Sequence, residues 1–346
     1  MKSEIDNNHE HSSDPSGQNL KRILPGLIIS ALSLAVIFYV VDFQQFINAL
    51  RFADYRFILV AGLLAVLWVF VRTFAWRSLL QGQAAFWQVF FTVNEGYFLN
   101  NILPFRLGEI GRSFLLSEKS KLSFWGVFST ILIERALDVA LAAGLLLITL
   151  PFVVGGNWAF PAAAAAILLV IIGLMIFYLI ARNNELILAL FEKWTIRWPT
   201  INRLGQTQLP LFFNGLTVLT DTGQFARSLL LFILNWGVAV IQYYCLMLAF
   251  FPEAKLLWAG FSLSVAALGI ALPSSPGAVG VFELTTVAAL TLLRLDPSTA
   301  LAYAITAHIF NYLITGVLGA YGFARDGETI TGIYYRIRGI SLKDAA

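Results

Sequence analysis

Apolar residues run through the chain in long stretches, and most of these stretches are long enough to cross a membrane. A window of more than about 18 apolar residues can span the hydrocarbon core of a bilayer, which is about 30 Å thick. Strands of a membrane barrel alternate apolar and polar residues, and these stretches do not, so we expect helices. The pattern predicts nine of them, at residues 23–41, 57–76, 84–103, 122–150, 160–181, 227–250, 256–273, 277–293 and 298–323.

The third segment runs into the polar stretch NNILPFRLGEIGR at residues 100–112. If all nine segments crossed fully, the basic segments 105–121 and 182–227 would face the outside, against the bias of lysine and arginine toward cytoplasmic loops. A re-entrant hairpin removes the conflict, with helix 84–103 breaking at Pro104 and returning through 106–117. Then 18 of the 23 basic residues and both termini are cytoplasmic. Of the other five, four face the outside, namely Arg51, Arg56, Lys255 and Arg294, and Arg135 lies within a helix.

A second interruption, ALPSSPGAVGVFE at residues 271–283, separates two apolar segments. It fits either a hairpin that enters from the outside or two complete helices joined by a cytoplasmic turn. Two broken elements pointing at each other from opposite faces are typical of inverted repeats in transporters, where they mark the substrate site. The residues expected to break or hinge these elements are Pro104, Gly108, Pro273, Pro276, Gly277 and Gly280.

Composition supports a membrane protein, because 58% of the 346 residues are hydrophobic, only 12% are charged, and the mean hydropathy is +0.76. An ordinary soluble domain has about 25% charged residues. We expect an all-α polytopic protein of the plasma (inner) membrane with about seven to nine membrane helices, one or two re-entrant or broken hairpins and a possible inverted repeat. Residues 1–22 are expected to be a disordered polar cytoplasmic tail, 23–323 the transmembrane domain and 324–346 a basic cytoplasmic tail. The connector 183–226, with Trp194 and Trp198, is expected along the cytoplasmic interface.

The remaining composition narrows the function classes. The net charge of +3 and the pI near 9.0 could suggest nucleic acid, but basic residues in such a chain more often mark cytoplasmic loops, so no nucleic-acid partner is expected. The single cysteine, Cys245, lies in an apolar run and excludes an intrachain disulfide. Outside the tail His308 is the only histidine, so no metal and no cofactor is expected.

Polar residues at helical spacing surround the first break. Asn94, Tyr97 and Asn101 would share one stripe of their helix, with Glu95 beside it. After the proline, Arg106, Glu109 and Arg112 recur every three residues along one side of the short returning helix. Such a polar tip is tolerated at membrane depth only when it is buried or lines a wet cavity. The alternative is a cytoplasmic loop with solvated arginines.

The helix at 122–150 carries three charged residues near its middle, Glu134, Arg135 and Asp138. Glu134 and Asp138 are four positions apart on one face, and Arg135 reaches Asp138 at i, i+3 spacing. Each ionised group at that depth costs at least about 2.5–3.5 kcal/mol on insertion scales, so the three must be paired or solvated by a cavity. A salt bridge that only holds helices together is the alternative.

Two further polar features lie toward the C-terminus. Glu283 stands alone in an apolar run, and His308, Asn311 and Thr315 share one face of the last helix. A lone intramembrane histidine is more often hydrogen-bonded packing than a ligand or a proton relay. Together with the groups above, these residues suit a zwitterionic or phosphate-bearing headgroup, because arginine offers a planar fork for phosphate and carboxylates can hold an ammonium or hydroxyls.

The order of the motifs NNILPFRLGE, GRSFLL, IERALD and LPSSPGAVGVFE resembles the transmembrane, flippase-like domain of the lysylphosphatidylglycerol synthase family, also called multiple peptide resistance factors. The resemblance covers about residues 23–323. It implies translocation of a modified phospholipid or another lipid, such as a polyprenyl-phosphate-linked sugar or a hopanoid. Synthases of that family continue into a soluble aminoacyl-transferring domain, which this sequence lacks, so lysyl transfer is not expected. The matching motif positions are Asn101, Pro104, Arg106, Gly108, Glu109, Arg112, Glu134, Arg135, Asp138, Pro273, Pro276, Gly277, Gly280 and Glu283.

We therefore expect a membrane lipid translocator, not an enzyme, that moves a polar or phosphate-bearing headgroup between leaflets through a charged cavity. Expected partners are a phospholipid or a polyprenyl-phosphate-linked lipid, the bilayer, and a possible separate lipid-modifying enzyme. The alternatives are a proton-coupled transporter of a small polar solute and an intramembrane lipid-modifying transferase. The expected translocation residues are Asn94, Glu95, Asn101, Arg106, Glu109, Arg112, Glu134, Arg135, Asp138, Glu283, His308 and Asn311.

Overall fold

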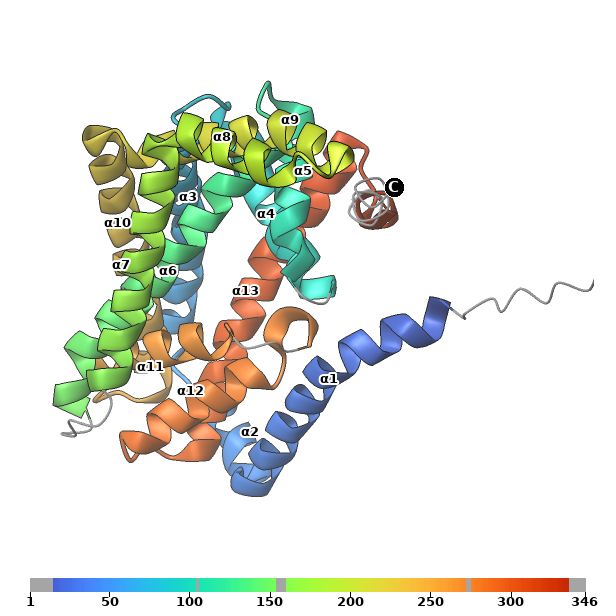
Figure 1. Cartoon of the computed structure of the whole chain (residues 1–346). Helices are drawn as coiled ribbons and strands as arrows, with labels where there is room; N and C mark the ends of the chain where they lie inside the picture. Colours follow the sequence, from blue (N-terminus) through green and yellow to red (C-terminus); the bar gives the residue numbers. More distant parts are fainter. Residues whose placement is uncertain (1–14, 104–105, 154–159, 272–274, 336–346) are drawn as a thin grey trace, which may run out of the picture.

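The long apolar segments form helices that run roughly alongside one another (Figure 1). The computed structural model describes residues 15–103, 106–153, 160–271 and 275–335, and these ranges are almost entirely helical, without β-strand. Four helices are long and apolar enough to cross a membrane: α3 (Tyr55–Leu79), α6 (Phe124–Val153), α10 (Thr222–Phe250) and α13 (Pro297–Asp326).

Two further candidate spans are bent pairs. The apolar part of α1 (Pro15–Val40) meets α2 (Phe43–Phe52) at 86°, and that of α7 (Phe160–Arg182) meets α8 (Asn184–Thr195) at 87°. The described part of the chain thus holds four to six spans, somewhat fewer than the seven to nine membrane helices expected. The all-α polytopic membrane fold is confirmed.

Aspartates define where four of these helices begin. The side chains of Asp42, Asp54, Asp221 and Asp296 accept hydrogen bonds of 2.8–3.0 Å from backbone N–H groups in the first turns of α2, α3, α10 and α13. An aspartate in this position satisfies a donor that the helix itself leaves unpaired.

The predicted hairpin around residue 104 is present as α4 (Phe86–Ile102) and α5 (Leu107–Lys119). The two helices pack backbone against backbone, since a Cβ added to Gly108 would lie 2.0 Å from the carbonyl oxygen of Gly96. The expected hinge Pro104 lies outside the described residues.

The second break also forms a helical hairpin. It consists of α11 (Leu256–Gly269), the short η4 (Pro276–Ala278) and α12 (Val281–Leu292); Pro273 lies outside the described residues. With 14 and 12 residues, α11 and α12 rise only about 21 Å and 18 Å at 1.5 Å per residue, short of a bilayer core. The structure therefore favours the hairpin over two complete spans.

The two hairpins enter from opposite ends of the molecule and meet near its middle (Figure 1). The order helix, hairpin, helix occurs twice, as α3, α4–α5, α6 and as α10, α11–α12, α13. The two sets run in opposite directions, as expected for an inverted repeat. Apolar residues of the two sets pack against each other in two clusters. One joins Trp76 and Ile131 of the first set to Phe232 of the second, and the other joins Ala61 of the first set to Met247 and Tyr303 of the second.

The connector 183–226 forms α8 and α9 (Pro199–Leu216), which cross the end of the molecule from which α4–α5 enters (Figure 1). Trp194 is 79% exposed on α8, as suits a helix at a membrane surface. The helix α2 was not predicted, because its ten residues mix polar and apolar positions and are too short to span.

Both expected tails contain regular structure. The helix α1 begins at Pro15, so it includes residues 15–22 of the expected N-terminal tail. Residues 330–335 are helical as well, and Ile333 is fully buried against Leu99, Leu115 and Phe323.

Candidate functional site

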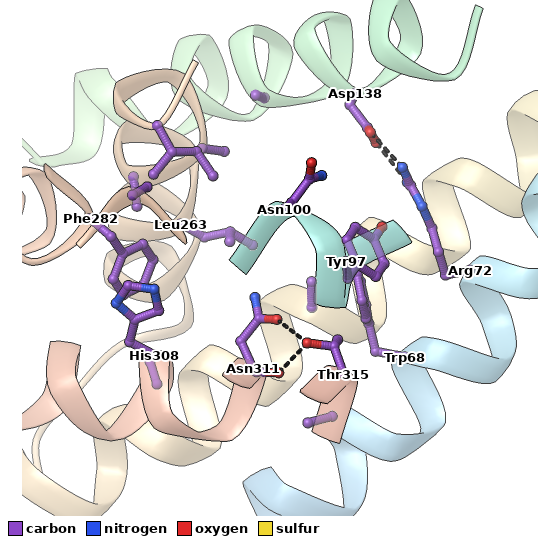
Figure 2. Close-up of a pocket in the computed structure, with 18 of the residues that line it drawn as sticks. Trp68, Arg72, Tyr97, Asn100, Asp138, Leu263, Phe282, His308, Asn311 and Thr315 are labelled. Carbon is purple, nitrogen blue, oxygen red and sulfur yellow. Dashed lines mark hydrogen bonds and ion pairs between the residues drawn. The ribbon is translucent and has the colours of Figure 1, made fainter. Parts of the chain in front are cut away.

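A cavity of about 330 Å³ lies between the two hairpins and the helices beside them. This volume lies at the lower end of the range of small-molecule sites, about 300–1,000 Å³. Figure 2 shows Arg72 and Asp138 near one end of the cavity, His308 and Phe282 near the other, and Asn100, Asn311 and Thr315 between them. Other polar or aromatic lining residues are Trp68, Tyr97, Asn101, Asn235, Trp236, Gln242 and Tyr243.

A buried ionic network forms one wall, and Glu134 of α6 is its centre. Glu134 is fully buried and accepts hydrogen bonds from Arg72 at 2.6 Å and from Arg135 at 2.5 Å. The guanidinium of Arg112 on α5 binds both of its oxygens, at 2.8 and 2.9 Å. One carboxylate thus joins α3, α5 and α6.

Asp138, one turn further along α6, extends the network into the cavity. Its two oxygens accept hydrogen bonds from Arg72 at 2.8 and 2.7 Å, and Arg135 lies 3.1 Å away at the expected i, i+3 spacing. The indole of Trp236 on α10 donates to the same carboxylate at 3.2 Å. Arg135 also lies 3.6 Å from Glu109 of α5.

Aromatic rings complete the surroundings of the buried arginines. The guanidinium carbon of Arg112 lies 3.9 Å from the centroid of the Trp76 ring, and that of Arg72 lies 5.1 Å from Phe232. Charges at membrane depth persist only when they are paired or solvated, and this network supplies the pairs.

Arg106 occupies the tip of the α4–α5 hairpin, directly before α5. It has a left-handed backbone with φ of 53°, a conformation that is strained for a non-glycine residue. Next to it, the backbone N–H of Gly108 donates to the side chain of Asn100 at 2.9 Å, which fixes the start of α5. The Arg106 side chain donates to the carbonyl oxygen of Ile270, at the tip of the other hairpin, at 2.7 Å.

Arg106 differs from the other three arginines of this site. Arg72, Arg112 and Arg135 each contact carboxylates, whereas Arg106 has no carboxylate at ion-pair distance within the described ranges. The wall formed by the ionic network and Arg106 holds one more arginine than carboxylates, with Arg72, Arg106, Arg112 and Arg135 against Glu109, Glu134 and Asp138.

The opposite wall centres on His308 of α13. Its Nδ1 contacts Oε1 of Glu283 on α12, and its Nε2 lies 3.0 Å from the carbonyl oxygen of Gly277 in η4. The other oxygen of Glu283 accepts the N–H of Gly280 at 2.7 Å, which caps the start of α12. Gly277, with φ of 67°, packs against Tyr312 so closely that a Cβ would meet its hydroxyl.

The structure brings together ten of the twelve predicted translocation residues. Three are buried behind the cavity surface: Glu134 and Glu283 contact the lining residues Arg72 and His308, and Arg112 contacts Glu134. Seven line the cavity, namely Asn101, Arg106, Glu109, Arg135, Asp138, His308 and Asn311.

Asn94 and Glu95 do not line the cavity. The Asn94 amide donates to the carbonyl of Phe90 in its own helix at 2.8 Å. Glu95 is fully buried and pairs with Lys119 at 2.6 Å, and Lys119 also contacts Asp326 at the end of α13. These contacts hold α4, α5 and α13 together away from the cavity.

The sequence interpretation missed Arg72, which it counted among the cytoplasmic basic residues. Arg72 is 2% exposed and lies within α3, seven residues before its end at Leu79. An arginine that far inside an apolar helix was the available signal, but nothing in the local spacing links it to Glu134, 62 positions later.

The chain is similar to a known family and to several known membrane proteins. The family model for the lysylphosphatidylglycerol synthase TM region matches residues 23–319. The UPF0104 membrane protein MJ1595 of Methanocaldococcus jannaschii is 24% identical over 325 residues, which cover 85% of this chain and 91% of that protein. A second protein of that organism, UPF0104 membrane protein MJ1078, is 26% identical over 239 residues, covering 65% and 93%.

A larger relative is the glycosyltransferase AglD of Haloferax volcanii, 24% identical over 335 residues, which cover 86% of this chain but 53% of that protein. No solved structure matches the chain at a significant level. Because the family model matches most of the chain, this protein belongs to the lysylphosphatidylglycerol synthase transmembrane-region family.

Proposed function

We propose that this protein is a translocator that moves a lipid with an anionic, phosphate-bearing headgroup between the two leaflets of the membrane. The headgroup occupies the cavity between the hairpins while the acyl chains stay in the bilayer. The lipid is a phospholipid or a polyprenyl-phosphate-linked lipid, made by a separate enzyme. The protein lies in the plasma membrane with both termini in the cytoplasm.

The observation that carries the proposal is the position of Arg106. It lines the cavity at the junction of the two hairpin tips, and its guanidinium is bound to a backbone carbonyl and to no carboxylate of the described residues. A planar guanidinium can give a phosphate two parallel hydrogen bonds. Binding such an anion would also balance the excess positive charge of the wall formed by the ionic network and Arg106.

The two hairpins supply a route for movement. Elements broken near mid-depth and entering from opposite sides support alternating access, in which one half rocks against the other around a fixed site. Arg106 contacts Ile270 across the junction of the tips, so separating the hairpins frees its guanidinium.

Transport fits the carboxylates of the ionic network, Glu134 and Asp138, better than group transfer. A general acid or base must be free to exchange a proton with its substrate. Glu134 and Asp138 are instead held by Arg72 and Arg135, which gives them a structural and charge-balancing role. The match to the glycosyltransferase AglD covers 53% of that protein, and we propose that the shared part handles the lipid.

The test is leaflet exchange in vesicles that contain the purified protein. Fluorescent phosphatidylglycerol in the inner leaflet is protected from dithionite added outside, and exchange removes that protection. We expect wild type and Arg56→Gln to accelerate exchange and Arg106→Gln to be close to empty vesicles. Arg56 is an exposed arginine at the start of α3, so its variant controls for the loss of one charge.

A second probe tests the headgroup chemistry. A fluorescent glucosylceramide lacks phosphate, and we expect its exchange to be accelerated less than that of phosphatidylglycerol. Wild-type protein that moves neither lipid, or that moves both equally with and without Arg106, would contradict the proposed function.

A further inference from the structure

The Glu283–His308 pair shows a hydrogen-bonding pattern that ordinary ionisation does not satisfy. Nδ1 of His308 contacts Oε1 of Glu283, and Nε2 contacts the carbonyl oxygen of Gly277 at 3.0 Å. A neutral imidazole has one donor and one acceptor nitrogen, and an ionised carboxylate only accepts. A neutral histidine beside an ionised glutamate would leave one of these contacts without a hydrogen.

One additional proton satisfies both contacts. Either the imidazole carries a hydrogen on each nitrogen, or Glu283 is a carboxylic acid that donates from Oε1 to Nδ1 while Nε2–H donates to Gly277. The remaining oxygen of Glu283 already accepts the N–H of Gly280, so it needs no hydrogen. In both forms the pair holds one proton that is free to leave.

The pair joins moving parts of the proposed translocator. His308 belongs to α13 and lines the cavity, whereas Glu283 and Gly277 belong to the α11–α12 hairpin. The His308 ring packs against Phe282 and Tyr312, each with ring centroids 4.7 Å away. Glu283 and His308 are 9% and 12% exposed, which shields the pair while leaving it in reach of the cavity.

The titratable groups around the pair are few in the described residues. Tyr312 lies on α13 itself, while α11 and residues 28–40 of α1, which also pack near the start of α12, carry no Asp, Glu, Lys, Arg or His. The other wall of the cavity adds Arg106, Glu109, Arg135 and Asp138.

We propose that Glu283 and His308 form a proton-binding latch that controls opening of the cavity between the α11–α12 hairpin and α13. This inference rests on the proposed lipid translocation and adds its coupling to protons. With the proton bound, His308 holds both Glu283 and Gly277, and the hairpin is docked on α13. Release of the proton to water in the cavity leaves an ionised Glu283 and a neutral His308, which can keep only one of the two contacts.

The latch predicts the direction of the pH effect. Histidine is the side chain whose charge changes between about pH 5 and pH 8. Leaflet exchange of fluorescent phosphatidylglycerol should therefore accelerate as the pH rises through this range, by up to about tenfold per pH unit.

Glu283→Gln mimics the protonated form of Glu283 at every pH, because glutamine does not ionise. The glutamine oxygen accepts the Gly280 N–H, as in a capping box, and its amide donates to Nδ1 of His308. We expect this variant to exchange lipid at the slow low-pH rate at every pH. Glu253→Gln, at an exposed site in the turn before α11, should keep the wild-type profile.

A second measurement reads the latch without lipid transport. The hydrogen–deuterium exchange rate of residues 276–284 is measured in wild type and in Glu283→Gln at the same pH. The ratio of the two rates cancels the intrinsic pH dependence of amide exchange. The ratio should be near one at about pH 5 and clearly above one at about pH 8.

The outcomes separate the two proposals. Wild type that moves lipid at a rate independent of pH, or Glu283→Gln with the wild-type profile, would overturn the latch. A deuterium ratio that stays at one across the range would overturn it as well. If no lipid moves at any pH, the translocator fails while the deuterium ratio still decides the latch.

Discussion

The guanidinium of Arg106 donates a 2.7 Å hydrogen bond to the carbonyl of Ile270, 164 positions later in the chain. This contact joins the tip of a hairpin that enters from one end of the molecule to the tip of a hairpin that enters from the other (Figure 1). The same arginine lines the cavity without a carboxylate partner in the described residues. Arg106 therefore lies where the two hairpin tips meet and where we propose that the headgroup binds.

Replacing Arg106 with lysine tests its geometry apart from its charge. An ammonium keeps the charge but lacks the planar fork that binds phosphate through two hydrogen bonds. We expect Arg106→Lys to lower leaflet exchange of phosphatidylglycerol by about tenfold, the effect of about 1.4 kcal/mol. Thermal unfolding should be nearly unchanged, because the side chain is exposed in the cavity. Exchange at the wild-type rate would remove Arg106 from the headgroup site.

Replacing Arg72 with methionine tests the buried network. Arg72 is 2% exposed and binds both Glu134 and Asp138, so its loss leaves carboxylates with fewer partners. Removal of one partner from a buried ion pair costs about 3–5 kcal/mol. We expect a large drop in the unfolding temperature of Arg72→Met in detergent and little change for Arg56→Met on the same helix. Equal unfolding temperatures for the two variants would show that the network does not stabilise the fold.

The close packing of α4 on α5 makes Gly108 sensitive to a single methyl group. A Cβ at this position would lie 2.0 Å from the Gly96 carbonyl and 2.6 Å from the Asn100 side chain. The helices would have to separate, and such overpacking costs about 1–3 kcal/mol. We expect Gly108→Ala to lower the unfolding temperature and to slow lipid exchange.

Gly144→Ala is the matched control, because a Cβ there has no neighbour within 4 Å. Alanine is the better helix former by about 1 kcal/mol, so this variant should be neutral or slightly more stable. If Gly108→Ala behaves in the same way, the hairpin is not closely packed.

Lys119 balances the buried Glu95 outside the cavity. Lys119→Met should destabilise the protein, since Glu95 is fully buried and then lacks its cation, while Asp326 keeps Arg325 at 2.8 Å. Adding Glu95→Gln should recover part of the loss, and a double-mutant cycle in detergent unfolding measures the coupling. Strictly additive losses would mean that the two side chains do not interact.

The sequence predicted the helices and both breaks because apolar length and basic-residue bias are properties of local segments. The same reasoning placed Glu134 and Asp138 on one face of α6, where both now bind Arg72. It left the break at 271–283 open between a hairpin and two spans, because the total apolar length suits either. The helix lengths in the structure favour the hairpin.

The sequence could not predict which side chain on another helix each polar or charged residue contacts. Helical spacing grouped Asn94 with Asn101, but the two side chains lie in different surroundings, one against its own helix and the other in the cavity. Glu95 was expected at the site and instead meets Lys119, which had drawn no attention as a charged residue after the hairpin. Contacts between residues far apart in the sequence depend on how the helices pack, and a local sequence pattern does not show this.

The account depends most on an anionic lipid headgroup bound beside Arg106 in the cavity. Native mass spectrometry of protein purified in mild detergent measures this directly, as the lipid retained by wild type, Arg106→Gln and Arg56→Gln. We predict a phosphate-bearing lipid on wild type and Arg56→Gln that is largely lost from Arg106→Gln. Equal retention by all three proteins, or retention only of lipids without phosphate, would contradict the account.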